Sequence, residues 1–261
     1  MYAKSLPLRI FVFVTFVFLL APIVVVVLVS FNPTSAFKIP TTAVSFKWYE
    51  KFFSLAGFRD SLFLISLPVA VASSVVATAI GTLAATGLQR SRIFARDLVE
   101  SFFMLPLLIP SILLGAALYL VYSGMGLAGS FWTIVVGHSL LGIPYVIKVV
   151  GAGLAAVDKR LEEAAISLGC TPTQAFIRVV LPVIRSSILS GAIFAFIVSF
   201  SDINLALFIA GPKTTTLPIH IYSQIFWEGD PTIAAASTTQ IFIVGGLLLL
   251  IQRLFNVRMS F

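Results

Sequence analysis

Long apolar runs separated by short polar stretches are the dominant pattern along this chain. A bilayer core about 30 Å thick is crossed by roughly 20 apolar residues, because each residue of an α-helix rises about 1.5 Å. Six segments meet this length: 10 to 31, 61 to 88, 98 to 122, 131 to 155, 186 to 210 and 233 to 252. The pattern predicts an all-α, polytopic membrane protein with six transmembrane helices in a single domain covering residues 1–261.

Proline occurs inside several of these segments, at Pro22, Pro68, Pro106, Pro110 and Pro144. A membrane-spanning helix tolerates proline where neighbouring helices satisfy the freed carbonyl groups. We therefore expect the six helices to pack on one another.

Composition supports the membrane assignment. The chain is 59% hydrophobic and 10% charged, whereas about 25% of the residues of a soluble domain are charged. The net charge of +7 comes from basic residues at the ends of apolar runs and not along one polar face, which argues for membrane topology and against nucleic acid as a partner. The single cysteine, Cys170, excludes an internal disulfide and a cysteine-rich metal site.

The distribution of lysine and arginine predicts the orientation, because cytoplasmic loops carry an excess of both. With a cytoplasmic N-terminus, that side holds twelve: Lys4, Arg9, Arg90, Arg92, Arg96, Lys148, Lys159, Arg160, Arg178, Arg185, Arg253 and Arg258. The opposite side holds five: Lys38, Lys47, Lys51, Arg59 and Lys213. Both termini are therefore predicted to be cytoplasmic. Residues 1–31 also resemble a signal peptide, but their apolar stretch is long and lacks a small-x-small cleavage site.

The predicted cytoplasmic loop, residues 156–185, contains the sequence EEAAISLGCTPTQAFIRVVLP. Its first half predicts a short helix, because Asp158, Glu162 and Glu163 place negative charge at the positive end of a helix dipole. Gly169 predicts the end of that helix, since glycine accepts the left-handed conformation common just past a helix.

The second half of the loop predicts another short helix. Thr171 is placed as the N-cap, Pro172 occupies the first helical position, and Gln174 completes a capping box. This helix is expected to end at Pro182. The loop is therefore predicted to be folded.

Ala164 and Ala165 lie beside Ile166 and Leu168 and give the first helix a flat apolar face. Two interpretations remain open on physical grounds. The face either packs on the helix ends of this chain or receives another protein.

The loop also resembles a known motif. Glu163-Ala164-Ala165, Gly169, Val179 and Leu181-Pro182 have the spacing of the EAA motif of type I ATP-binding-cassette importer permeases, with Val179 in place of the usual isoleucine. The resemblance implies that the first helix is a coupling helix, which docks on an ATPase subunit and transmits its closure. The coupling residues implied are Glu162, Glu163, Ala164, Ala165, Leu168 and Gly169.

Further stretches are similar to the polyamine-type branch of these permeases, and to the second of its two permease subunits. They are SFKWYEKFF, GHSLLGIPYVIKVVGAGL and SFSDINLALFIAGPKTTTLPIHIY. No phosphate-binding loop of the form G-x-x-x-x-G-K-[ST] occurs in the chain. The resemblance therefore implies no catalytic residue, metal or cofactor here, with ATP and Mg²⁺ bound by two partner ATPase subunits. It also implies a second, different permease subunit and a periplasmic or extracellular solute-binding protein, all working by alternating access. The membrane implied is the bacterial inner (plasma) membrane.

Asp202 is the acidic residue in the fifth predicted span. A carboxylate inside a membrane costs at least about 2.5 to 3.5 kcal/mol, so such groups usually face a cavity or a partner. With Ser199, Ser201 and Asn204 nearby, Asp202 either lines the translocation pathway or makes a structural ion pair or hydrogen bond. Polyamine permeases often carry two consecutive acidic residues here, and Ser201 stands at the first position, so an opine or an amino-phosphonate remains an alternative solute.

His138 is the only histidine inside a predicted span, and Lys148 lies ten residues later in the same span. We interpret His138 as a hydrogen-bonded packing residue and Lys148 as a side chain that reaches the headgroups. Two other classes of protein make different predictions. A stand-alone secondary transporter or channel predicts repeated ionisable groups or broken helices near the midplane, and a hydrolase would need His138 to activate a serine such as Ser123 or Ser139.

Overall fold

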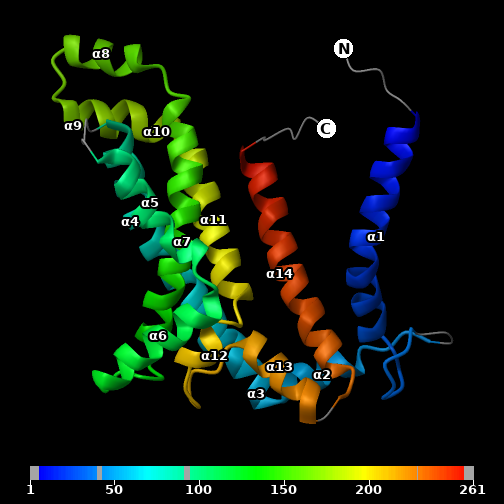
Figure 1. Cartoon of the computed structure of the whole chain (residues 1–261). Helices are drawn as coiled ribbons and strands as arrows, with labels where there is room; N and C mark the ends of the chain where they lie inside the picture. The colour runs from blue at the N-terminus through cyan, green and yellow to red at the C-terminus, as the bar shows by residue number, and fades with distance from the viewer. Residues whose placement is uncertain (1–5, 40–42, 91–94, 228, 256–261) are drawn as a thin grey trace. The chain divides into compact units, whose positions relative to one another are not determined.

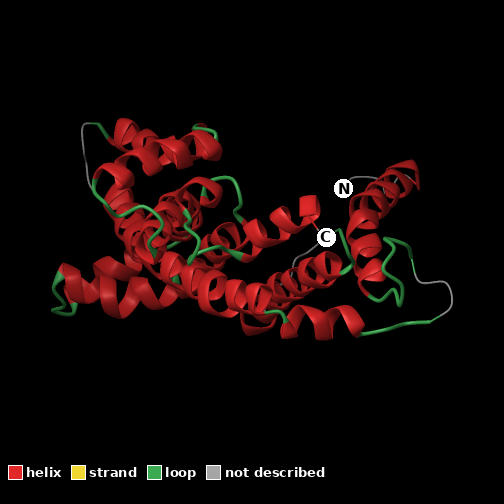
Figure 2. Cartoon of the chain, turned by 90° about the horizontal axis from the view of Figure 1, so that it is seen from below, coloured by secondary structure: helices red, strands yellow, loops and turns green. Residues whose placement is uncertain are grey.

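The computed structural model describes residues 6–39, 43–90, 95–227 and 229–255. These residues form helices joined by loops, without a strand among them (Figures 1 and 2). In chain order the α-helices and the two π-helical segments, η1 and η2, are α1 (Leu6–Ser30), α2 (Lys47–Ser54), α3 (Ala56–Asp60), η1 (Ser61–Ser66), α4 (Leu67–Arg90), α5 (Arg96–Leu108), α6 (Ser111–Gly124), α7 (Phe131–Ala155), α8 (Lys159–Ser167), α9 (Pro172–Ala175), η2 (Phe176–Val180), α10 (Leu181–Val183), α11 (Arg185–Ser201), α12 (Ala206–Ile209), α13 (Leu217–Trp227) and α14 (Thr232–Phe255).

Four stretches of the described chain are long and apolar enough to cross a membrane as single helices. They are α1, the run Ala56–Arg90, α7, and Thr232–Leu250 of α14. Two further spans arise if each bent helix pair is counted as one, namely α5 with α6, and α9 to α10 with α11. The all-α class is thus confirmed, and the six expected spans are present on that count.

The third span is not the continuous helix expected over residues 98–122. Helices α5 and α6 meet at an angle of 97°, and Ile109 between them is extended, with φ −85° and ψ 129°. The cause is local, since a residue that precedes proline avoids the helical conformation and Pro110 follows Ile109. Pro106 is accommodated inside α5.

The fifth span also differs from the continuous helix expected over residues 186–210. Helix α11 begins at Arg185 and ends at Ser201, and Asp202 is extended with ψ 133°. The chain becomes helical again only in the short α12. Aspartate favours such a break, because its carboxylate competes with backbone carbonyls for nearby N–H groups.

The described residues include two π-helical segments, and each ends two residues before a proline. Segment η1 precedes Pro68 and η2 precedes Pro182. Leu67 and Leu181 donate their N–H groups five residues back, to Leu62 and Phe176. Proline lacks the N–H that would continue the α-helical ladder, which explains why the turn before it widens.

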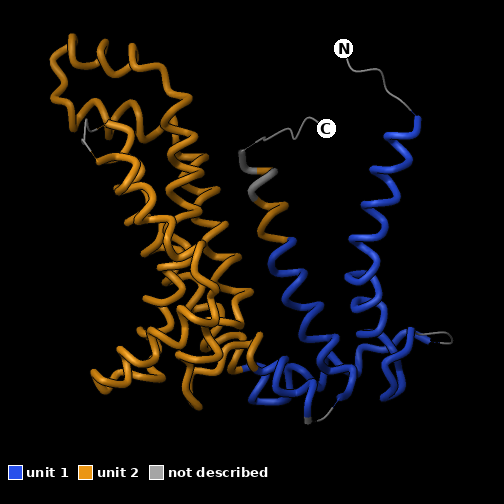
Figure 3. The backbone as a smooth tube through the Cα atoms, viewed as in Figure 1, with its two compact units in different colours: residues 1–59, 220–245 blue, residues 60–219, 246–261 orange. Residues whose placement is uncertain are grey.

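The described chain divides into two compact units, residues Met1–Arg59 with His220–Gly245, and residues Asp60–Ile219 with Gly246–Phe261 (Figure 3). In the first unit, Trp48 Nε1 donates a 2.6 Å hydrogen bond to the carbonyl of Asn32. Lys51 forms an ion pair with Asp230. These contacts fix α2 against the end of α1 and the loop before α14.

The second unit is built on α4, α7 and α11, which pack along one another. Helix α7 is the most enclosed of the four single-helix spans, with 72% of its most apolar stretch buried, against 6% for α1. Gly81 permits close contact between α4 and α7, because a Cβ atom there would lie 2.6 Å from Cβ of Val146. Helices α8 to α10 lie at one end of this bundle, and α6 and α12 lie at the other (Figure 1).

Candidate functional site

The EAA loop, residues 156–185, begins with a capped helix. Oδ1 of Asp158 accepts a 2.9 Å hydrogen bond from the N–H of Arg160 at the start of α8. At its end Gly169 has φ +93°, and the N–H of Cys170 donates to the carbonyl of Ala165 at 3.1 Å. The start and the glycine termination of the first helix are both as the sequence predicts.

The second arm of the EAA loop begins with the expected capping box. Oγ1 of Thr171 accepts from the N–H of Gln174 at 3.3 Å, and Oε1 of Gln174 accepts from the N–H of Thr171 at 3.0 Å. Pro172 is the first helical residue. The arm continues through η2 and α10 to Val183, one residue past the predicted end.

The two alanines of α8 lie in different environments. Ala165 is buried on a helix that packs against α9 and η2, whereas Ala164 is exposed. Leu168 is 88% exposed, and Glu163 and Ile166 are also exposed. One side of α8 therefore packs on its own chain, as the first interpretation expects, and the other side is exposed.

Glu162 and its neighbour Glu163 also differ. Oε2 of Glu162 lies 2.6 Å from Nη2 of Arg90, the last residue of α4, while Glu163 is exposed. The guanidinium carbon of Arg90 lies 4.5 Å from the ring centroid of Phe176 in η2. Sequence reasoning missed Arg90 as a member of this site, because 72 positions separate it from Glu162.

The second candidate site surrounds the break after α11. Oδ2 of Asp202 accepts hydrogen bonds from the N–H groups of Leu205 at 3.1 Å and Ala206 at 3.0 Å. The carboxylate thus satisfies two backbone N–H groups at the start of the short helix α12. Asp202 has a structural role whatever else it contacts.

A buried histidine joins this break to α7. Nδ1 of His138 lies 2.7 Å from Oγ of Ser199, and its Nε2 lies 3.6 Å from Oδ2 of Asp202. His138 and Ser199 are 1% and 4% exposed. The interpretation of His138 as a hydrogen-bonded packing residue is confirmed, and its position inside a predicted span was the signal in the sequence.

Glycines on two neighbouring helices receive the segment that follows Asp202. A Cβ atom at Gly115 of α6 would lie 2.8 Å from the carbonyl oxygen of Leu205. A Cβ atom at Gly137 of α7 would lie 2.7 Å from Cδ1 of Ile209. Leu205 and Ile209 are fully buried, so the broken end of the fifth span is firmly packed.

Asp202 lines a cavity of about 390 Å³. The wall includes the bend between α5 and α6, residues 106 to 111, and is completed by Leu141, Tyr145 and Val198. Ser199 faces His138, and Ser201 and Asn204 are exposed without lining this cavity. Of the four residues assigned to the pathway from sequence, only Asp202 therefore reaches the cavity.

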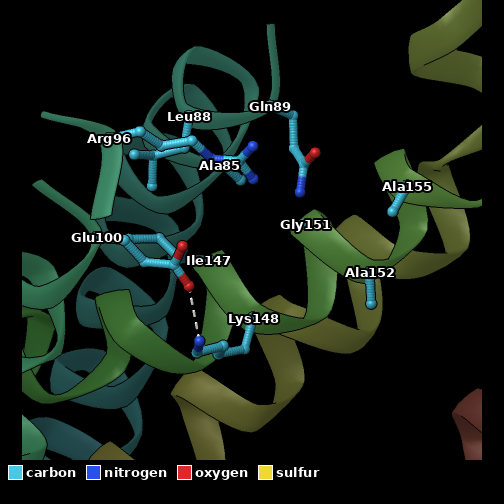
Figure 4. Close-up of a pocket in the computed structure, with 10 residues that line it drawn as sticks. All are labelled: Ala85, Leu88, Gln89, Arg96, Glu100, Ile147, Lys148, Gly151, Ala152 and Ala155. Atoms are coloured by element: carbon cyan, nitrogen blue, oxygen red, sulfur yellow. Dashed lines mark hydrogen bonds and ion pairs between the residues drawn. The ribbon is translucent and has the colours of Figure 1, made fainter. Parts of the chain in front are cut away.

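Lys148 lies near the opposite end of α7 and makes an ion pair. Its Nζ is 2.8 Å from Oε1 of Glu100 in α5, beside a cavity of about 170 Å³ (Figure 4). The side chains of Arg96 and Gln89 also line this cavity. The expectation that Lys148 extends alone to the headgroups was incomplete, because a carboxylate on the neighbouring helix pairs with it.

The two serines considered as nucleophiles for hydrolysis are not the serine that hydrogen-bonds to His138. The hydroxyl of Ser139 donates to the carbonyl of Val135 at 2.7 Å, and Ser123 is exposed at the end of α6. The serine that does contact His138, Ser199, is buried. Within the described ranges, no group of three or more His, Cys, Asp or Glu side chains is placed to hold a metal ion.

These features define a class of protein: a polytopic helical membrane protein with an ordered two-helix loop at one end of its bundle and a polar cavity near the other. The family described as "Binding-protein-dependent transport system inner membrane component" matches residues 77–261. The chain belongs to this family, and it is therefore an inner-membrane transport component that works with a solute-binding protein.

Individual relatives support the assignment. The chain is 31% identical over 241 residues to the putrescine transport system permease protein PotI of Escherichia coli, covering 88% of this chain and 84% of that protein. It is 27% identical over 245 residues to the spermidine/putrescine transport system permease protein PotC of Haemophilus influenzae, covering 93% of each.

A solved structure shares the fold. It is the crystal structure of a bacterial ABC transporter involved in the import of the acidic polysaccharide alginate. The TM-score is 0.72 at 14% identity, covering 97% of this chain and 98% of that one.

Proposed function

We propose that this chain couples ATP hydrolysis in partner subunits to import of a polyamine-like solute by alternating access. The observation that carries the proposal is the EAA loop, whose helix α8 is capped, packed on one side and open on the other. An ordered surface of this kind suits docking, because little conformational entropy is lost when a partner binds it. Glu163, Ala164 and Leu168 would form the contact, and Gly169 would set the angle between the two helical arms.

The proposed assembly contains this chain, a second and different permease subunit, two ATPase subunits and an external solute-binding protein. ATP and Mg²⁺ would be bound by the ATPase subunits, with neither a cofactor nor enzymatic activity in this chain. The whole chain, residues 1–261, would act as one permease domain with both termini in the cytoplasm. The lysine and arginine distribution supports this orientation. Of the residues behind it, Lys4, Arg92 and Arg258 lie outside the described residues.

The proposed solute is a polyamine such as spermidine or putrescine. Relatives with those names support it, as does the carboxylate of Asp202 in the cavity wall, which would attract a cationic amine. Ser201 in place of a second acidic residue weakens that field, so an opine or amino-phosphonate is the competing solute class. The other residues assigned to the pathway would act only as polar neighbours of Asp202. They are Ser199, Ser201 and Asn204.

Transport by reconstituted proteoliposomes tests the proposal. With ATPase, second permease and binding protein present, spermidine uptake is expected to require ATP, and Leu168→Asp is expected to abolish it. Uptake that continues without any ATPase subunit would identify a secondary transporter or channel instead. Binding measurements on the binding protein with polyamines, opines and amino-phosphonates would decide the solute class.

Asp202→Asn tests the pathway residue separately. Asparagine keeps a side-chain oxygen for the N–H groups of Leu205 and Ala206 but removes the charge. Uptake of a cationic solute should fall while uptake-independent ATP hydrolysis remains. Ser201→Ala is the matched control, because it changes an adjacent side chain that does not line the cavity. Equal uptake by wild type and Asp202→Asn would remove Asp202 from the pathway.

A further inference from the structure

Arg90 makes contact with both arms of the EAA loop. Its guanidinium pairs with Glu162 of α8 at 2.6 Å and lies 4.5 Å from the ring centroid of Phe176 in η2. A guanidinium can do both at once, because it is planar and presents edge donors to a carboxylate while its face lies over a ring. One cation therefore connects two segments that meet at the joint around Gly169.

The helix that carries Arg90 has no short covalent link to the EAA loop. Helix α8 follows α7 after residues 156–158, and α10 leads directly into α11. Helix α4, the third helix of the bundle, packs along both α7 and α11. A displacement of α8 thus has a short path through the chain to α7 and α11, whereas its path to α4 runs through side chains.

Apolar contacts reinforce the connection on the second arm. Leu88 of α4, Val180 of η2 and Ile184 are buried in one cluster, and Phe176 packs against it. Helix α8 contributes no buried residue to this cluster. The ion pair with Glu162 is a direct polar contact between α8 and the end of α4.

We propose that Arg90 is a positioning residue that makes α4 move together with the EAA loop when a partner displaces α8. This inference rests on the proposed coupling function. The pair is partly exposed, with side-chain exposures of 32% and 24%, so solvent screens it and it contributes little to the stability of the fold. Its loss should change coupling and leave folding intact.

The single cysteine of the chain provides a local probe. Cys170 follows Gly169 at the joint and is partly exposed, so the wild-type chain in its assembled complex takes one spin label. Arg90→Ala and Glu162→Gln should each increase the mobility of that label. The double variant Arg90→Glu with Glu162→Arg should restore it, because the ion pair is re-formed with its charges exchanged. Lys148→Ala removes a different ion pair, on α5 and α7, and should leave the label unchanged.

The functional measurement is spermidine uptake per ATP hydrolysed in proteoliposomes. Arg90→Ala should lower this ratio by up to about fivefold, the change in population that a partly exposed ion pair can produce. Arg90→Lys should give an intermediate ratio, since an ammonium cannot contact the carboxylate and the ring as a planar group does. The charge-exchanged double variant should recover most of the ratio.

Two results would overturn the inference. In the first, label mobility rises in Arg90→Ala while uptake per ATP stays at the wild-type value, so that Arg90 only holds the loop. In the second, neither quantity changes. A wild-type complex without ATP-driven uptake is a different outcome, and it would overturn the proposed function together with the role of Arg90 in it.

Discussion

Replacing Gly169 by alanine tests how far coupling depends on the joint of the EAA loop. Gly169 has φ +93°, and a Cβ atom there would meet no atom within 4 Å. The substitution therefore adds no steric contact with the rest of the chain. Its effect comes from the backbone alone, since the left-handed conformation costs a residue with a side chain roughly 1–2 kcal/mol.

Part of that cost is offset in the unfolded chain, because alanine has fewer conformations to lose than glycine. We take about 1 kcal/mol as the net change, which corresponds to about a fivefold decrease in the ratio of molecules with α8 and α9 in the observed arrangement to molecules without it. The affinity of the complex for its ATPase subunit falls as the fraction in that arrangement falls, so it should decrease by up to about the same factor. Surface-immobilised permease complex and purified ATPase subunit would give the dissociation constants.

Two further variants make the measurement specific. Gly169→Asn should weaken binding less than Gly169→Ala, because asparagine visits the left-handed region more readily. Gly151→Ala should have no such effect, since Gly151 is inside α7 and its added Cβ would make only an ordinary contact, 3.9 Å from Nε2 of Gln89. Equal affinities for wild type and Gly169→Ala would refute the reasoning, as would equal weakening by alanine and asparagine.

Three other predictions concern stability. Burial alone would raise the pKa of Asp230. Hydrogen bonds from Lys51 and Thr232 outweigh this effect and hold that pKa below its usual value. The stabilisation from the Lys51–Asp230 ion pair is therefore complete above the unfolded pKa, about 3.9, and disappears as pH falls through the lower folded pKa. Asp230→Asn should flatten the acid limb of a plot of melting temperature against pH. An unchanged acid limb would show that the ion pair does not stabilise the fold. Gly115→Ala should destabilise the fold by about 1–3 kcal/mol, because its Cβ would lie 2.8 Å from a backbone atom. Gly137→Ala should cost less, because its Cβ would meet only the ends of side chains. Thermal unfolding in detergent measures both, and a larger loss for Gly137→Ala would contradict the reasoning. His138→Ala should cost about 1–3 kcal/mol by leaving a buried hydroxyl without its partner, and an unchanged melting temperature would contradict that role.

The features predicted correctly from sequence are those that depend on neighbouring residues. The capping box at Thr171 and the end of α8 at Gly169 depend on hydrogen bonds that span at most five positions. Local hydrogen bonds of this kind follow from residue type and spacing, so the fold of the EAA loop was predictable. The all-α class was predictable for a related reason, because apolar length alone requires helices in a bilayer.

The breaks in the third and fifth spans were not predicted, because the length of an apolar run does not show whether the helix bends within it. Pro110 and Asp202 interrupt the helix without interrupting the apolar run. The signals were present, since Ile109 precedes a proline and aspartate often caps a helix.

Contacts between distant positions could not be predicted in the same way. The pairs Arg90 with Glu162 and His138 with Ser199 are 72 and 61 residues apart. Only the packing of α4, α7 and α11 brings them together. The sequence marked these side chains as unusual, by charge or by depth in the membrane, but did not specify their partners.

The burial of α7 has a consequence for how the protein is made. Helix α7 is the least apolar of the four single-helix spans and also the most enclosed, and it carries His138, whose hydrogen-bonding partner Ser199 lies on α11. While the nascent chain is being synthesised, α7 emerges when α4 is already in the bilayer but α11 has not yet been translated. Its imidazole would then face lipid without a partner, which is costly in hydrocarbon. We expect α7 to stay beside the insertion machinery until α11 arrives, so that the two helices leave it together for the bilayer.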